Sequence, residues 1–219
     1  MKKLKFLAFI LCVVMMPMLT ACNNDDEPTP SFLIFATYSE ATSAGSVFTA
    51  QRNLDSPLVT YTTSVVLDGE HYKVGNRYII NFTNDNNRCY ESGPINLLYI
   101  VDVCNGDITE ASREEIAKVS VDPLEFLMIQ REGHYINVQA VAYVHTQPTL
   151  FNMYVDRETV NNEIPDVYFG FKSDVLSSQK QLFGSFDIAS VWDLPTCKGI
   201  CIHYGANNEN KTLTFSKEQ

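Results

Sequence analysis

The four residues Leu-Thr-Ala-Cys at positions 19–22 constrain this chain more than any other feature, because they decide which part of it folds. They follow three lysines within the first five residues and an uncharged apolar segment at 6–18. That segment is shorter than the roughly 20 residues of a membrane span and is typical of a secretory signal peptide. A cysteine directly after the expected cleavage site of the signal peptide is typical of a lipoprotein. We therefore expect residues 1–21 to be removed and Cys22 to be lipidated; the alternative is an ordinary cut near Ala21.

Lipid on Cys22 predicts a membrane anchor. Each buried methylene contributes about 0.8 kcal/mol, and two acyl chains already give stable anchoring. No later segment approaches 18 apolar residues, so we expect lipid to be the only anchor. Residues 22–30 (CNNDDEPTP) form an acidic, proline-containing tether. Its acidic residues resemble the surface-export signals of lipoproteins in anaerobic Gram-negative bacteria. We expect an outer-membrane lipoprotein on the cell surface, with the periplasmic face as the alternative.

The charge of the mature chain disfavours nucleic-acid binding. Cleavage removes three lysines and no acidic residue, which changes the formal net charge from −10 to −13. Such a protein repels phosphate backbones. The negative charge is explained by solubility or by binding to a basic partner. The sequence does not predict an oligomeric state. The 13 Phe and 11 Tyr favour an all-β fold.

Short apolar, β-branched and aromatic segments separated by turn residues predict two β domains. In the first half they fit a small OB-like β-barrel domain spanning 31–109. In the second half they fit a β-sandwich domain spanning 110–219. Ser112 and Glu115 form a capping-box pattern that predicts a helix over 113–119. The predicted strands are 32–39, 47–52, 59–67, 77–83, 95–104, 124–130, 135–144, 150–155, 166–172, 183–188, 199–204 and 212–215.

Four cysteines remain once Cys12 leaves with the signal peptide and Cys22 is lipidated. Four thiols allow three pairings, and the compartment outside the cytoplasm permits disulfides. The preferred pairing joins the first two and the last two, the latter through a turn at Lys198-Gly199. The alternative is four free or buried thiols. A four-cysteine zinc site is disfavoured because neither pair has two-residue spacing. The four are Cys89, Cys104, Cys197 and Cys201.

No motif predicts catalysis, a metal or a cofactor. The histidines lack the spacing of metal ligands, so each is expected to be a surface or packing residue. Gly184-Ser185 lacks the context of a nucleophile elbow. The loop at 84–87 (NDNN) has calcium-like composition but reads better as a solvated turn. Three aromatic residues are candidates for a sugar-binding face: Tyr90, Tyr99 and Trp192. Trp192 is the main one, although a core or rim position suits it equally. The four histidines are His71, His134, His145 and His203.

The order of these features resembles the NigD-like lipoprotein family. The resemblance implies an N-terminal OB-like domain and a C-terminal β-sandwich. The family takes its name from a gene near a bacteriocin locus, which implies an immunity role, but no activity or binding residues carry over. The segment before Val47 departs from the family pattern. The segments that carry the resemblance, besides the lipidation signal and acidic spacer, are 73–83 (KVGNRYIINFT), 98–100 (LYI), 122–123 (DP), 133–138 (GHYINV) and 184–188 (GSFDI).

We therefore expect a non-enzymatic, membrane-anchored binding or protective module with a protein or glycan ligand. Immunity against a bacteriocin is one version of this function. An accessory glycan-binding role at the cell surface is the alternative. An envelope hydrolase or a redox protein is the competing class, although Cys197 and Cys201 lack the Cys-x-x-Cys spacing of a thioredoxin-like site.

Overall fold

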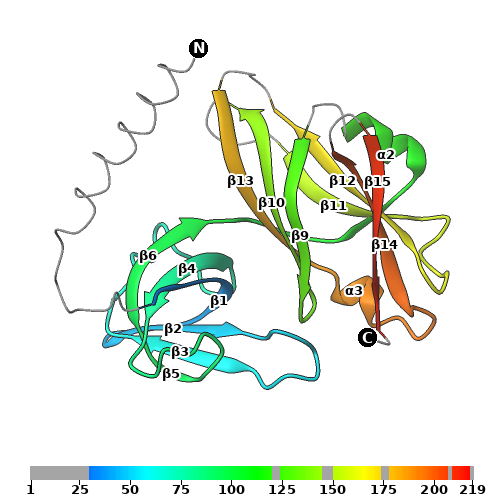
Figure 1. Ribbon diagram of the computed structural model, residues 1–219. Helices are drawn as coiled ribbons and strands as arrows, with labels where there is room; N and C mark the ends of the chain where they lie inside the picture. The colour runs from blue at the N-terminus through cyan, green and yellow to red at the C-terminus, as the bar shows by residue number, and fades with distance from the viewer. Residues whose placement is uncertain (1–29, 120–123, 145–149, 174–177, 207–208, 218–219) are drawn as a thin grey trace, which may run out of the picture. The chain divides into compact units, whose positions relative to one another are not determined.

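The structure of the protein is a computed structural model that describes residues 30–119, 124–144, 150–173, 178–206 and 209–217. Ser31–Gln219 forms one compact unit. Most of the described residues lie in strands, which confirms the all-β prediction (Figure 1). None of the helices within these ranges is long and apolar enough to cross a membrane.

The N-terminal half forms a six-stranded sheet in the order β5-β3-β2-β1-β4-β6. Its strands are β1 (Phe32–Thr42), β2 (Gly45–Ala50), β3 (Val59–Thr63), β4 (Arg77–Thr83), β5 (Gly93–Pro94) and β6 (Asn96–Asp102). The third strand ends at Thr63, earlier than the sequence pattern predicts. One face of the sheet buries a core that includes Ile34, Tyr38, Phe48 and Ile80.

The two ends of this sheet are joined along the chain. β5 pairs in parallel with β3, whereas β6, which a single residue separates from β5, pairs antiparallel with β4. The residue between them, Ile95, is buried and donates its backbone N–H to the carbonyl of Thr62. The sheet therefore has the connectivity of the expected OB-like barrel. Among the described residues, however, no backbone hydrogen-bond ladder joins β5 to β6, so the barrel is not closed.

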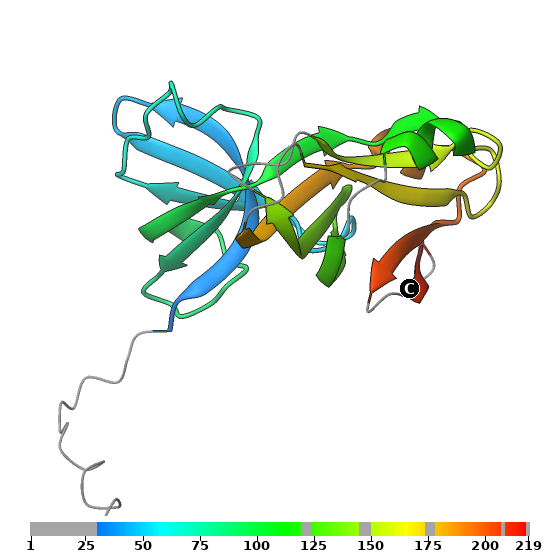
Figure 2. The same ribbon diagram turned by 90° about the horizontal axis from the view of Figure 1, so that it is seen from above.

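Two further sheets form the predicted β-sandwich (Figure 2). Their strand orders are β7-β13-β10-β9 and β15-β14-β12-β11-β8. Side chains from both enclose one core, which includes Val138, Met153, Phe186 and Ile202. The hairpin between β9 and β10 turns at Gly133, whose φ of 55° lies in the left-handed region that glycine tolerates. The strands are β7 (Cys104–Asp107), β8 (Thr109–Ala111), β9 (Leu124–Glu132), β10 (Tyr135–Val144), β11 (Leu150–Asp156), β12 (Asp166–Lys172), β13 (Ser178–Asp187), β14 (Gly199–Ala206) and β15 (Glu209–Ser216).

Two short helices accompany the sandwich. The first, α2 (Arg113–Val119), has the predicted bounds. Its capping box is formed, because Glu115 accepts a hydrogen bond from the Ser112 backbone at 2.8 Å and donates its own N–H to the Ser112 hydroxyl at 3.3 Å. The second, α3 (Ala189–Trp192), has no counterpart among the predicted elements.

Candidate functional site

The outer face of the sheet β15-β14-β12-β11-β8 carries a group of reactive side chains. β12 and β14 are parallel, and Asp166 pairs with Cys201 in their register. Val167 and Ile202 point into the sandwich core and are fully buried. Because side chains alternate along a strand, the flanking positions 166, 168, 201 and 203 face the other side of the sheet. The alternation thus places a carboxylate, a thiol and an imidazole together.

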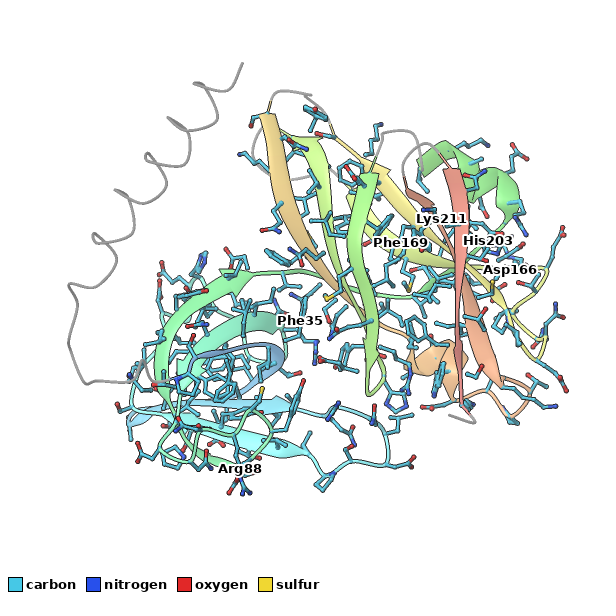
Figure 3. The ribbon with its side chains drawn as sticks, viewed as in Figure 1. Phe35, Arg88, Asp166, Phe169, His203 and Lys211 are labelled. Atoms are coloured by element: carbon cyan, nitrogen blue, oxygen red, sulfur yellow. The ribbon has the colours of Figure 1, made fainter. Side chains whose placement is uncertain are left out.

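Asp166, Cys201 and His203 form the centre of this group. Figure 3 labels Asp166 and His203. The Nε2 of His203 donates a hydrogen bond to Oδ1 of Asp166 at 2.6 Å. One ligand atom from each of the three side chains lies within 4.8 Å of the other two. The His203 and Asp166 side chains are 32% and 27% exposed, so solvent and small molecules can reach the group.

Tyr168 fixes the orientation of the imidazole. Its ring stacks on that of His203, with the centroids 4.5 Å apart and the planes inclined by 11°. Partial burial, together with the negative charge of Asp166, raises the pKa of the Tyr168 phenol. Its hydroxyl oxygen is buried and has no hydrogen-bond partner among the described residues. Tyr168 therefore contributes through its ring, and its hydroxyl is an energetic cost.

Arg113, the first residue of α2, connects the group to the neighbouring carboxylates. Its Nε donates to Asp156, and its Nη2 lies 3.4 Å from Oδ2 of Asp166. Its guanidinium lies 4.6 Å from the centre of the Tyr168 ring. The hydrogen bond to Asp156 is the main reason why the pKa of Arg113 is raised. Asp166 therefore has one oxygen toward the arginine and the other toward the imidazole.

The helix reaches this position because β12 has a glycine beneath it. A Cβ atom on Gly170 would lie 2.6 Å from the Tyr154 ring and 3.0 Å from a methyl group of Val119 in α2. Real Cβ atoms essentially never approach as closely as the first of these distances. Gly170 therefore lets α2 and Tyr154 approach the sheet at this point.

A second polar cluster lies between the N-terminal sheet and the sandwich. Arg77 Nη2 lies 3.5 Å from Oε2 of Glu132, and both residues are buried. Asn137 donates to Glu132 at 2.7 Å and accepts a hydrogen bond from Ser185 at 2.7 Å. The Tyr90 hydroxyl also donates to Glu132, at 3.0 Å. Desolvation by burial raises the pKa of Glu132 and lowers that of Arg77. We interpret this buried network as a structural joint.

The cysteines do not form the preferred disulfides, because all four are free thiols in the structure. Cys89 packs against the N-terminal core and Cys104 against the sandwich core, which separates the first pair. Cys197 is buried and donates to the Gly199 carbonyl at 3.2 Å. Cys201 instead lies with Asp166 and His203.

The aromatic candidates do not form a sugar-binding face. Trp192 is the clearest correction, because it lies in α3 with 1% of its surface exposed and belongs to the sandwich core. The Arg131 guanidinium covers its ring at 4.6 Å. Tyr90 belongs to the joint, and only Tyr99, at 52%, is well exposed. A ligand cannot stack on Trp192 in this fold.

The other sequence candidates divide between surface and core. His71 and His134 lie on the surface, where they pair with Asp102 and Asp193 respectively. His145 and Cys22 lie outside the described residues, as does the acidic tether up to Thr29. Ser185 is buried within the joint and is not exposed as a nucleophile.

An open groove of about 600 Å³ is a further feature of the surface. Its size is that of a small-ligand site. Residues of β6, β7 and β13 line it, including Val101, Cys104 and Phe183. The exposed pair His71–Asp102, 3.4 Å apart, lies on it. The lining is mixed, and no group of convergent reactive side chains like that at Asp166 is found among its described residues.

Comparison with solved structures shows which proteins share this fold. A protein of unknown function from Bacteroides vulgatus has a TM-score of 0.68 and 13% identity, over 87% of this chain and 92% of that one. A NigD-like immunity protein from Bacteroides caccae has a TM-score of 0.59 and 11% identity, over 85% and 97%. The chain has the NigD-like fold.

This result confirms, at the level of fold, the resemblance found in the sequence. A candidate lipoprotein from Bacteroides fragilis is similar in structure to this chain as well, with a TM-score of 0.58 and 9% identity, over 87% of this chain and 99% of that one. No family model matches the sequence, and no curated protein matches it either. At these identities the likeness concerns the fold alone.

Three residues of the joint come from segments that carried the NigD-like resemblance. Arg77, Asn137 and Ser185 belong to three such segments, far apart in the sequence. Asp166, Cys201 and His203 lie outside all of them. Sequence reasoning missed this group because its members come from two strands with a long connection between them. The signal that could have found it is the i, i+2 spacing of Cys201 and His203 on one strand face.

Proposed function

We propose that the mature protein is a lipid-anchored, non-enzymatic binding or protective protein of the bacterial cell envelope. The observation that carries this proposal is the cysteine at position 22, placed directly after Leu-Thr-Ala and shortly before the fold begins at Phe32. Residues 22–31 reach at most about 35 Å even when fully extended. A partner must therefore meet the folded unit close to the membrane surface.

Protection against a bacteriocin is the version we favour. The structural neighbour from Bacteroides caccae is described as an immunity protein, and a protective protein has to act where a toxin reaches the envelope. The net charge of −13 after removal of the signal peptide favours a basic partner. We place the folded unit on the outer face of the outer membrane, because the acidic tether resembles a surface-export signal.

Two assays test the cell-surface location and the protective function separately. Protease digestion of intact cells should degrade the folded unit, with mass spectrometry confirming lipid on Cys22. Protection until the outer membrane is broken would place it in the periplasm. Expression in a bacteriocin-sensitive strain should raise survival, and a Cys22→Ala variant at equal abundance should not. Unchanged killing of cells that express the lipidated protein would reject immunity.

A thiol-dependent envelope enzyme is the second candidate function. Cys201, His203 and Asp166 provide a nucleophile, a base and a group that orients the base, as covalent catalysis requires. A catalytic Cys201 should react with iodoacetamide far faster at neutral pH than Cys104 does. Equal labelling rates would reject this enzyme class. A glycan-binding role has lost its main support, because Trp192 is buried.

A further inference from the structure

We infer that Asp166, Cys201 and His203 form a binding site for one zinc ion on the outer face of the C-terminal sheet. The inference does not depend on the lipid anchor or on the protective function. It starts from the position of the residues in the sheet. Asp166 and Cys201 are direct partners in the parallel register of β12 and β14, and His203 follows on the same face. The backbone ladder thus brings the three side chains together.

The kinds of ligand select the metal. A thiolate and an imidazole suit Zn²⁺, whereas Ca²⁺ and Mg²⁺ prefer sites made entirely of oxygen ligands. Zinc accepts a carboxylate oxygen as its third protein ligand. Three protein ligands leave one tetrahedral position open, and the partial exposure of Asp166 and His203 lets water or another ligand reach it.

The distances require only a small rearrangement. Ligand atoms around a tetrahedral zinc lie about 3.3–3.6 Å from each other, given metal–ligand bonds of about 2.0–2.3 Å. The three ligand atoms already lie within 4.8 Å of one another. Nε2 of His203 and the Asp166 oxygen would have to open from 2.6 Å, with the metal replacing the proton that they share. Rotations of side chains on a fixed sheet can supply such shifts.

The surroundings orient the ligands and balance the charge. Tyr168 stacks on His203, and Arg113 holds the second oxygen of Asp166. Such supporting contacts typically change metal affinity by about 10–100-fold. With Cys201 as a thiolate, the charges of Asp156, Asp166, Cys201 and Arg113 add to −2, which one Zn²⁺ neutralises. The charge of Arg113 is therefore no obstacle to the metal.

Titration of the full-length mature protein in detergent tests the site. Co²⁺ serves as a spectroscopic substitute, since a thiolate ligand gives a charge-transfer absorption, and competition with Zn²⁺ gives the zinc affinity. We expect one ion per chain, with thiolate-to-cobalt absorption, and protection of Cys201 from iodoacetamide when zinc is added. Cys201→Ser, His203→Gln and Asp166→Asn each change a direct ligand, so each should weaken binding by more than the roughly 10–100-fold that the loss of a supporting contact costs.

Cys104→Ser is the matched control, because Cys104 is another half-buried strand cysteine and burial raises the pKa of its thiol. It should bind zinc like the wild type. Circular dichroism in the presence of EDTA verifies that each variant folds. Failure of the wild type to bind one equivalent of zinc would overturn the inference. So would equal binding by Cys201→Ser and the wild type, because the metal would then lie elsewhere.

Discussion

Arg77 and Glu132 form an ion pair at 3.5 Å that is buried between the N-terminal sheet and the sandwich. Arg77 belongs to β4 and Glu132 ends β9, so the pair joins the two halves of the folded unit. The Arg77 guanidinium also lies 4.1 Å from the centre of the Tyr135 ring. Asn105 accepts a hydrogen bond from the Arg77 backbone at 2.7 Å and donates one to it at 3.0 Å.

Removing both members of this pair should destabilise the protein by less than the sum of the two single removals. Arg77→Met should lower the free energy of unfolding by about 3–5 kcal/mol, because it leaves a buried carboxylate without its countercharge. The double variant Arg77→Met, Glu132→Gln should lose less than the sum of the two single losses. Urea unfolding of all four proteins measures the coupling. Strict additivity would show that the two side chains act independently.

Gly170→Ala should move α2 away from the sheet. The added Cβ would meet the Tyr154 ring and Val119, and overpacking of this kind costs about 1–3 kcal/mol. The contact of Arg113 with Asp166 should weaken as well. Thermal unfolding measures the stability loss. Gly205→Ala is the control, because β14 has open space around Gly205. Equal effects of the two substitutions would contradict the packing argument.

Tyr168→Phe should leave stability unchanged or raise it by up to about 1 kcal/mol. The substitution removes a buried hydroxyl that has no partner in the described structure and keeps the ring that stacks on His203. Tyr168→Ala should instead destabilise the protein, because it removes the stacking as well. Urea unfolding of the two variants separates the contributions. A clear loss of stability in Tyr168→Phe would mean that the hydroxyl has a partner after all.

Trp192→Ala should destabilise the sandwich by about 3–5 kcal/mol, the usual cost of removing a large aromatic side chain from a core. Trp192→Phe retains an aromatic ring and should lose less. Differential scanning calorimetry measures both losses. A Trp192→Ala protein as stable as the wild type would show that the ring does not support the core.

Cys22→Ala should block lipidation and leave an uncleaved or mislocalised precursor, since the thiol is the group that accepts the lipid. Fractionation of cells and the mass of the N-terminal peptide measure this outcome. A serine variant of Cys89 serves as control and should be processed normally. A Cys22→Ala protein that is cleaved and retained in the membrane as efficiently as the wild type would contradict the lipid anchor.

Local sequence patterns determined the elements but not the site. The strand at 77–83 and the helix at 113–119 have the predicted bounds, because an apolar alternation and a capping box act over neighbouring residues. The predicted end of this strand at Leu67 was wrong, because β3 ends at Thr63 and the β-branched Val65 and Val66 outside it satisfied the same propensity. The residues around Trp192 could not show whether it lies in the core or on the surface. The helix α3 has a single turn, which is too short for a repeating pattern of apolar residues.

The sequence by itself determined the lipidation signal, the all-β composition and most of the strands of this protein. Only the tertiary structure decided that Asp166 meets His203 and that Arg77 meets Glu132. Both pairs depend on which strands lie side by side and in which register, and a shift of one residue would turn Cys201 and His203 toward the opposite face. Register follows from the packing of whole sheets around a shared core, which no local window of the sequence contains.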